Sequence, residues 1–403
     1  LHNESELRRE PFCEHYGTCG GCKWQHIDYP SQAQLKDTWA TDCLTRIGKV
    51  EVGETLPIVA AEEVQFYRNK MEYTFSNKRW LYENETLEDL EHTNALGFHA
   101  PGRFDKVLAI NKCWLQDDKG NDIRNFVYEY CIANDYTFYD LKEHTGLMRN
   151  LMLRNTKGGD WMINVIFAKK EDDKIESLLK AIQEKFNPKA LNYCINEKLN
   201  DSTFDQEFIS YSGDFEIQEE LGGLKFNISP KSFFQTNPVQ ADKLYEVAID
   251  FADIQKTDVV YDLYCGTGTI TCVAATKAKK AVGVEIIEEA IEAAKVNAGI
   301  NGLSNVEFLA GDMKDVFNEA FYKEHGKPDI IITDPPRSGM HPKVVDYLAY
   351  IACPKIVYVS CNPATQARDL AMLDAKYKVV KSQAVDMFPQ THHAENVVLL
   401  ELR

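Results

Sequence analysis

The chain has 403 residues, more than one ordinary domain contains, so we expect two or three domains. Hydrophobic residues make up 44% of the sequence and charged residues 27%, a composition that favours packed cores and argues against global disorder. With 45 Lys and Arg against 62 Asp and Glu, the formal net charge is −17, which excludes a protein that coats nucleic acid with bulk positive charge; an RNA ligand would need a local basic face.

Cysteines gather near the N-terminus in CEHYGTCGGCKWQH, which contains Cys13, Cys19 and Cys22. One interpretation is a disulfide or two. Three cysteines within ten residues, in a loop that glycines loosen, favour instead thiolate ligands that converge on a metal. Their spacing leaves both a four-cysteine zinc site and a [4Fe-4S] cluster open, and the fourth ligand is not adjacent to them.

A helix is predicted over residues 31–48, because Pro30 precedes Ser-Gln-Ala-Gln, which has the pattern of a capping box. A stripe of side chains recurs along it every four residues: Leu35, Trp39, Cys43 and Ile47. We interpret this stripe as core packing, and we expect the helix to pack on the C-terminal domain.

The rest of the first half has the pattern of antiparallel strands. LMRNLMLRNT and WMINVIFAKK flank the turn KGGD and predict a hairpin, and residues 67–82 and 94–102 predict further strands. Basic side chains on these segments indicate either an RNA-binding face or ordinary solvated charge: Arg68, Lys70, Lys78, Arg79, Arg149, Arg154 and Lys157. We therefore predict an α+β, antiparallel-sheet domain over residues 1–230 that carries the cysteine cluster and binds RNA.

From Asp258 onward, apolar runs alternate with helical patterns, which indicates a parallel sheet buried on both faces. The five runs joined by helices are residues 258–265, 281–286, 305–312, 329–336 and 355–362. Only a loop separates the last two runs, residues 377–385 and 396–403, so these should pair as an antiparallel edge. The predicted fold class of residues 231–403 is thus α/β, the Rossmann-like, seven-stranded arrangement of class I methyltransferases.

A glycine turn in YDLYCGTGTIT follows the first of these strands and opens a helix. Gly266 and Gly268 would let backbone amides approach a ligand closely. Glu285 ends the next strand, where a carboxylate can accept both ribose hydroxyls, and Asp312 ends the third strand, on the adenine side. The spacing and the strand order fit S-adenosylmethionine better than a dinucleotide.

Two further segments end strands at the same edge of the sheet: DPPRSG (334–339) and YVSCNPAT (358–365). Cys361 at such a strand end is poorly explained by packing. A third segment, DMFPQTHHAENVV (386–398), places Glu395 at the start of the last strand. His392 and His393 precede it and are interpreted as polar or structural residues.

These motifs resemble a known family, the S-adenosylmethionine-dependent RNA uracil-5-methyltransferases of the TrmA/RumA type. DPPRSG followed by IVYVSCNPAT is similar to its first signature, and DMFPQTHHAE to its second, with Ala394 where a bulkier apolar residue is usual. SFFQTN (232–237) resembles the segment that enters its methyltransferase domain. The resemblance covers nearly the whole chain and is closest to the iron–sulfur branch that modifies 23S rRNA.

The resemblance implies a role for each motif. Cys361 would be the thiolate that adds to C6 of uracil, which makes C5 nucleophilic, and Glu395 the base that removes the C5 proton. Gln235 and Asp334 would contact the uracil ring. The same pair would also line the methyl-donor pocket, together with Tyr264, Thr269, Glu285 and Asp312. Cys113 would be the fourth cysteine ligand, and only the resemblance favours a [4Fe-4S] cluster over zinc.

Three rival functions differ in what they require of the sequence. An exocyclic-amine methyltransferase would carry an aromatic residue where Arg337 stands and would leave Cys361 without a role. A cytosine-5 enzyme normally has Pro before its cysteine, whereas Ser360 precedes Cys361. An iron–sulfur RNA chaperone would methylate only incidentally.

The substrate must leave its base stack to reach Cys361, so we expect a uridine in a loop or single strand. The iron–sulfur branch implies 23S rRNA, and a uridine in the T-loop of tRNA is the alternative. No segment approaches the ~20 apolar residues that span a bilayer, and we expect a cytoplasmic monomer that does not enter a membrane.

Overall fold

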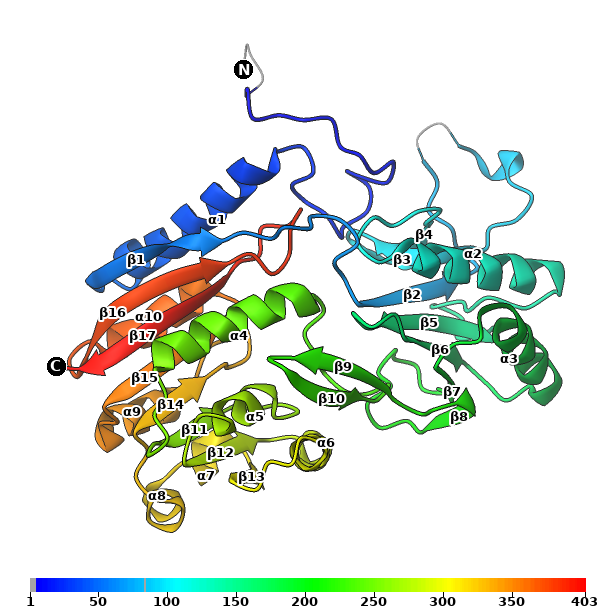
Figure 1. Ribbon diagram of the computed structural model, residues 1–403. Coiled ribbons are helices and arrows are strands. Elements are labelled where there is room, and N and C mark those ends of the chain that lie inside the picture. The colour runs from blue at the N-terminus through cyan, green and yellow to red at the C-terminus, as the bar shows by residue number, and fades with distance from the viewer. Residues whose placement is uncertain (1–4, 83–84) are drawn as a thin grey trace. The chain divides into compact units, whose positions relative to one another are not determined.

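The computed structural model describes residues 5–82 and 85–403 (Figure 1). The chain divides into two units, and each has its own large sheet. The first unit contains Leu1–Ile27, Glu63–Glu219 and Ile228–Lys231. The second contains Asp28–Glu62, Glu220–Asn227 and Ser232–Arg403. No helix among the described residues has both the length and the apolar character needed to cross a membrane.

This division differs from the predicted one mainly at residues 28–62, which belong to the second unit. The reason is an unpredicted strand, β1 (Val52–Val59), which pairs in parallel with β16 (Tyr377–Val385). Gly53 and Pro57 interrupt its apolar pattern, so the sequence gives little sign of a strand there.

The sheet of the first unit has seven strands in the order β4-β3-β2-β5-β6-β7-β8. Their bounds are β2 (Lys70–Ser76), β3 (Ala95–Ala100), β4 (Arg103–Ala109), β5 (Met148–Asn155), β6 (Trp161–Phe167), β7 (Ala190–Ile195) and β8 (Phe208–Gly213). The predicted hairpin is confirmed, since β5 and β6 pair antiparallel. One pair departs from the predicted antiparallel sheet, because β6 and β7 run parallel and are joined by a helical crossover.

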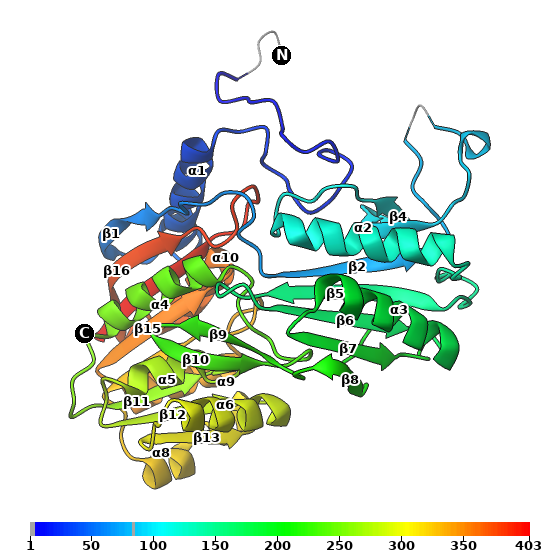
Figure 2. The same cartoon turned by 45° about the vertical axis from the view of Figure 1, so that its right-hand side comes forward.

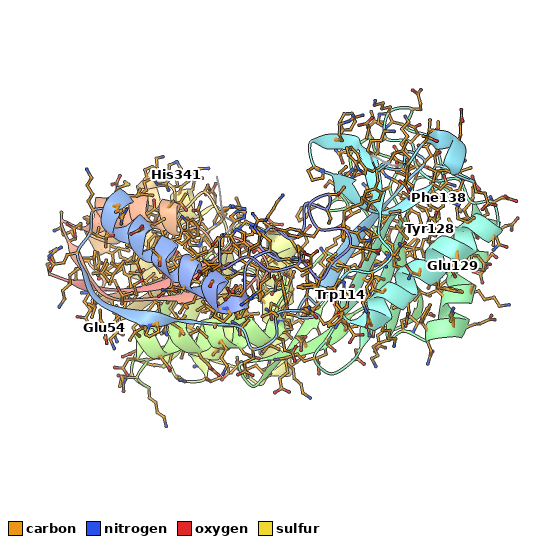
Figure 3. The ribbon with its side chains drawn as sticks, turned by 90° about the horizontal axis from the view of Figure 1, so that it is seen from above. Glu54, Trp114, Tyr128, Glu129, Phe138 and His341 are labelled. Carbon is orange, nitrogen blue, oxygen red and sulfur yellow. The ribbon has the colours of Figure 1, made fainter. Side chains whose placement is uncertain are left out.

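Two helices, α2 (Asp118–Ala133) and α3 (Asp172–Phe186), lie side by side on this sheet (Figure 2). They meet through Phe126 and Phe186, whose ring centroids are 5.4 Å apart. The ring of Tyr128, on α2, lies 5.9 Å from that of Phe138 (Figure 3). Aromatic side chains thus fill the space between the helices and the sheet.

The sheet of the second unit has eight strands in the order β1-β16-β17-β15-β14-β11-β12-β13. Besides β1 and β16, these are β11 (Val259–Leu263), β12 (Lys280–Glu285), β13 (Val306–Ala310), β14 (Ile330–Thr333), β15 (Lys355–Ser360) and β17 (Glu395–Leu402). The five predicted parallel strands are confirmed, and β17 pairs antiparallel with both β15 and β16. This is the predicted seven-stranded arrangement, with β1 added beside β16.

Helices cover both faces of this sheet; α4 crosses in front of β17 and β15, and α10 lies behind them (Figure 1). The helices are α1 (Tyr29–Asp42), α4 (Pro238–Ala252), α5 (Thr269–Ala275), α6 (Glu288–Ile300), α7 (Met313–Val316), α8 (Glu319–His325), α9 (Pro342–Ile351) and α10 (Pro363–Leu373). A separate hairpin consists of β9 (Ile217–Leu221) and β10 (Leu224–Ile228).

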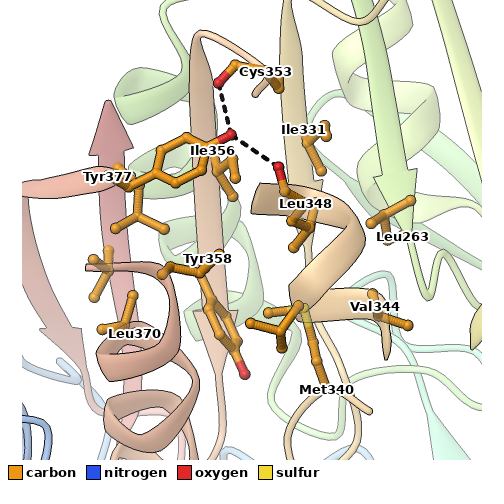
Figure 4. Close-up of a cluster of buried hydrophobic side chains, with 14 of the residues drawn as sticks. Leu263, Ile331, Met340, Val344, Leu348, Cys353, Ile356, Tyr358, Leu370 and Tyr377 are labelled. Atoms are coloured by element: carbon orange, nitrogen blue, oxygen red, sulfur yellow. Dashed lines mark hydrogen bonds between the residues drawn. The ribbon is translucent and has the colours of Figure 1, made fainter. Parts of the chain in front are cut away.

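The core between the sheet, α9 and α10 is apolar, with a few buried hydroxyls that find partners (Figure 4). The Tyr377 hydroxyl donates to the backbone carbonyls of Cys353 at 3.0 Å and Leu348 at 3.3 Å. Tyr358 is also fully buried, and its hydroxyl donates to Asp369 at 2.7 Å. Each of these buried hydroxyls thus has a hydrogen-bond partner, as is expected in a well-packed core.

The helix predicted over 31–48 forms as α1 followed by a π-helical turn, Cys43–Ile47, but its stripe was misinterpreted. Leu35, Trp39 and Ile47 are 42%, 37% and 58% exposed, and only Cys43 of the predicted stripe is buried. The buried face of α1 carries Gln32, Ala33, Lys36 and Ala40. Asp28, and not Ser31, caps the helix, and its side chain accepts from the Ser31 amide at 3.0 Å.

Candidate active site

The pairing of β15 with β17 brings the proposed nucleophile and base together. Ser360 is opposite Asn396 in the antiparallel ladder, so the residues one step further, Cys361 and Glu395, meet at the same edge. Leu263 and Thr333 are likewise paired in the parallel ladder of β11 and β14, which places Tyr264 beside Asp334. The functional residues therefore share the carboxyl edge of the parallel strands, where open α/β sheets bind ligands.

A cavity of about 1010 Å³ opens at this edge. It brings together Cys361, Glu395 and Asp334 with most of the predicted donor-binding residues: Gln235, Tyr264, Gly266, Thr269, Glu285 and Asp312. Gly268 is the exception, because it caps α5 without lining the cavity. A cavity of this size accommodates a nucleoside-sized ligand together with a reacting group.

The glycine turn needs glycine for two different reasons. Gly266 has a φ of +53°, and a Cβ built on it would meet no atom within 4 Å. Gly268 has a φ of +79°, and its Cβ would lie 2.8 Å from Ala294 and 2.9 Å from the Phe308 ring. The first glycine therefore leaves room beside the backbone, while the second allows the turn to pack against α6 and β13.

We expect Gly268→Ala to lower the free energy of unfolding by about 1–3 kcal/mol, because the substitution adds a steric overlap to an unfavourable φ. Gly299→Ala is the matched control; it lies inside α6 with open space around it and should raise the stability by about 0.5–1 kcal/mol. Urea unfolding of the two variants measures the difference, and equal midpoints would contradict the packing role.

The two acidic strand ends are held by backbone amides. Glu285 accepts from the amide of Gly266 at 3.1 Å and from those of Ile286 and Ile287 at 2.8 and 3.1 Å. Asp312 caps α7 through the Lys314 amide at 3.2 Å and pairs with the Lys314 ammonium, which lowers the pKa of its carboxyl. Both carboxylates are thus fixed at the cavity wall.

Cys361 lies in a loop that is tied to the neighbouring DPPRSG loop. Asn362 caps α10 by accepting from the Ala364 amide, and its side-chain amide donates to the Arg337 carbonyl at 3.2 Å. Thr365 donates its hydroxyl to the same carbonyl at 3.2 Å. These bonds hold the segment that follows Cys361 against the backbone of Arg337.

The proton affinities of the three central groups are all raised. Burial, then the Glu395 and Asp334 carboxyls, raise the pKa of Cys361 to about 11, and Arg337 acts in the opposite direction. Burial and Asp334 raise the pKa of Glu395 to about 8, and burial raises that of Asp334 to about 7. Such clustered perturbation is typical of groups that exchange protons during a reaction.

We expect the alkylation rate of Cys361 in the free protein to rise about tenfold per pH unit from pH 7 to pH 10, because only the thiolate reacts and its pKa is about 11. An ordinary cysteine would level off above its pKa of ~8.5. Iodoacetamide labelling followed by mass spectrometry of the Cys361 peptide gives the profile. Arg337→Gln should slow labelling at pH 8, and a plateau at pH 9 would contradict the raised pKa.

Several cavity residues were missed by the sequence analysis. Phe233, Ile286, Ile287, Tyr245 and Phe388 also line the cavity. Phe233 and Phe388 stand within the motifs SFFQTN and DMFPQTHHAE, and the two isoleucines directly after Glu285 were a further signal. His392 and His393 do not line the cavity, and burial and the neighbouring His392 lower the pKa of His393 to about 4.

The N-terminal cysteines form a second site, in the first unit. Cys13, Cys19, Cys22 and Cys113 line one cavity of about 360 Å³. All eleven cysteines are free thiols, so the disulfide interpretation is wrong. Among the described residues, no group of three or more Cys, His, Asp or Glu side chains lies close enough to hold a single metal ion.

Two of the seven basic residues considered for an RNA-binding face, Arg149 and Arg154, are buried, which corrects that interpretation for them, and two others form ion pairs. Arg149 is 1% exposed and donates to the carbonyls of residues 196, 198 and 200. Arg154 is 2% exposed. Lys78 pairs with Asp140 at 2.8 Å and Arg79 with Glu85 at 2.7 Å.

The strand order and the cavity at its carboxyl edge define a class I S-adenosylmethionine-dependent methyltransferase. A family model described as tRNA (uracil-5-)-methyltransferase matches residues 150–403. The chain belongs to this family and is an RNA methyltransferase.

Relatives and solved structures agree with this assignment. The chain is 51% identical to an uncharacterized RNA methyltransferase of Bacteroides thetaiotaomicron, over 100% of this chain and 90% of that protein. It is 50% identical to an uncharacterized RNA methyltransferase of Porphyromonas gingivalis, over 99% of this chain and 88% of that protein. The crystal structure of a Pyrococcus abyssi tRNA (uracil-54, C5)-methyltransferase in complex with S-adenosyl-L-homocysteine matches with a TM-score of 0.76 and 27% identity, over 99% of this chain and 88% of that one.

Proposed function

We propose that this enzyme transfers a methyl group from S-adenosylmethionine to C5 of a uridine in RNA through a covalent bond between Cys361 and C6. The observation that carries this proposal is the convergence of a thiol, Cys361, and a buried carboxyl, Glu395, in one cavity with the glycine turn. The binding of S-adenosyl-L-homocysteine by the Pyrococcus abyssi relative supports the choice of donor.

The donor supplies an electrophilic methyl group on a sulfonium. Cys361 forms its C–S bond at C6 of uracil, and the electron pair of the C5–C6 double bond moves toward O4, so that C5 becomes the nucleophile. After C5 has gained the methyl group, Glu395 takes the C5 proton, the double bond re-forms and the thiolate leaves. The thiol proton of Cys361 must be lost to solvent before the attack, and the methyl–sulfonium bond breaks as C5 gains the methyl group. The thiolate is regenerated at the end, so no oxidant or reductant is needed.

We assign the polar groups of the uracil ring to Gln235 and Asp334. Both line the cavity that contains Cys361. A side-chain amide can donate to the developing negative charge on O4, and a carboxylate can accept from N3–H. The donor itself would contact Tyr264, Gly266, Thr269, Glu285 and Asp312, with Gly268 shaping the turn.

For the RNA, we propose a loop or single-stranded uridine in 23S rRNA, on the basis of the four-cysteine cavity and the resemblance to the iron–sulfur branch. A tRNA uridine is the second candidate, favoured by the substrate of the Pyrococcus abyssi relative. Mass mapping of 5-methyluridine in both RNAs from a deletion strain tests them directly. Loss of a modification from 23S rRNA alone supports the first, and loss from tRNA alone rejects it.

We further propose that Cys13, Cys19, Cys22 and Cys113 hold a [4Fe-4S] cluster with a role in folding and RNA contact. Four thiols that line one cavity suit thiolate ligation of either zinc or a cluster, and the resemblance to the iron–sulfur branch is what favours the cluster. Iron, sulfide and zinc analysis of protein purified without oxygen tests this. About four irons and four sulfides per chain, lost in Cys113→Ser, are expected; one zinc would reject the cluster.

A further inference from the structure

One lysine of α1, Lys36, is fully buried. The Lys36 ammonium donates to Asp386 Oδ1 at 2.6 Å and to the Phe388 carbonyl at 3.0 Å, and both side chains of the ion pair are 0% exposed. These bonds join α1 to residues 386–391, the loop between β16 and β17. The loop contains Phe388, which lines the catalytic cavity, and leads to Glu395.

Other side chains of α1 hold the same loop. The Tyr29 hydroxyl donates to Asp386 Oδ2 at 3.1 Å. Gln32 and Gln390 are joined twice, because the Gln32 amide donates to Gln390 Oε1 and the Gln390 backbone donates to Gln32 Oε1, each at 2.9 Å. Gln390 has a φ of +67°, a conformation that needs support from its surroundings.

The opposite side of the loop is held by the segment that carries Gln235. Asn237 donates its side-chain amide to the Met387 carbonyl at 3.0 Å, and Gln240 donates to the Asp386 carbonyl at 2.9 Å. The loop is thus bonded on both sides, and Lys36 supplies a buried cation from α1.

Stability alone does not explain this arrangement. A buried ion pair loses so much hydration that apolar residues of similar volume are often equally or more stabilising. What apolar residues cannot supply is directional bonds to a carboxylate and a carbonyl two residues apart. Those bonds fix the path of the backbone between Asp386 and Phe388, and hence the entry into β17.

We propose that Lys36 is a positioning residue of the methyl-transfer reaction, which holds the 386–391 loop so that Glu395 meets the C5 proton. The inference deepens the proposed function, since it rests on Glu395 as the base. A displacement of about 1 Å at a reacting group can slow a step roughly 10²-fold. Loss of Lys36 should therefore slow the release of the Cys361 adduct while leaving donor binding unaffected.

The test compares Lys36→Met, Glu395→Gln and wild type with an RNA substrate and donor labelled in the methyl group. We expect Lys36→Met to lower kcat roughly 10²-fold and to accumulate labelled protein–RNA adduct on a denaturing gel, with the affinity for S-adenosyl-L-homocysteine within threefold of wild type. Lys381→Met is the matched control, because that lysine is half-exposed on β16 beside Glu54 and should behave as wild type.

Each outcome separates the two proposals. If Glu395→Gln accumulates labelled adduct and Lys36→Met does not, the positioning role is wrong and the proposed function stands. If Glu395→Gln gives no adduct, the base itself is wrongly assigned. Should Lys36→Met fail to fold, Gln32→Ala removes two milder bonds to the same loop, and a wild-type adduct level in that variant would overturn the inference.

Discussion

Replacing Cys361 by alanine should abolish methylation, with a fall in single-turnover rate on the order of 10⁴-fold or more, because no other group can activate C5 of uracil. The side chain is partly exposed to the cavity, and its loop is fixed through Asn362 and Thr365, so its removal should leave the fold intact. Transfer of labelled methyl groups to RNA gives the rate, and denaturing gels give the adduct, which should be absent.

Two further variants show whether a loss of activity comes from the missing thiol or from disturbed packing. Cys361→Ser keeps nearly the same shape, but its hydroxyl is far less acidic, so it should be as inactive as the alanine variant. Cys43→Ala removes a buried thiol outside the cavity and should retain turnover. A Cys361→Ala enzyme within tenfold of wild type would contradict the covalent mechanism. In cells, the same variant should also show the full deletion phenotype, and normal growth would favour the chaperone alternative.

Much of the catalytic unit could be predicted because its signals are local. The Val- and Ile-rich runs of β11 and β14 predict buried parallel strands, and parallel strands end at one edge, which gathers Tyr264, Asp334 and Cys361 without any knowledge of side-chain packing. The position of Glu395 followed from the loop between β16 and β17, which is too short for a parallel crossover.

The errors concern residues whose partners are distant in sequence. The stripe through Leu35 and Trp39 suggested the wrong buried face of α1, and nothing local indicates that Lys36 is buried, because its partner, Asp386, lies 350 residues away. Arg149 looked like an RNA contact because its partners are backbone carbonyls in another segment. A charge pattern shows that a side chain is basic, but burial is decided by the fold.

Glu395→Gln should give the second large effect, a fall of about 10²–10⁴-fold in turnover together with trapped enzyme–RNA adduct. Glutamine is isosteric but cannot accept the C5 proton, so the steps before elimination proceed and the C–S bond then persists. With donor labelled in the methyl group, the trapped adduct should carry the label, which shows that methyl transfer came first. Glu401→Gln, at the other end of β17, is the matched control and should turn over normally.

Normal turnover of Glu395→Gln would show that another group takes the proton, and the structure limits the choice. Asp334 is the other cavity carboxyl whose pKa is raised by burial, so it is the alternative acceptor for the proton. Trapping of labelled adduct by Asp334→Asn, with Glu395→Gln active, would move the base to Asp334. If Asp334→Asn instead accumulated unlabelled adduct, Asp334 would be needed for the methyl-transfer step itself, as the group that orients the uracil ring.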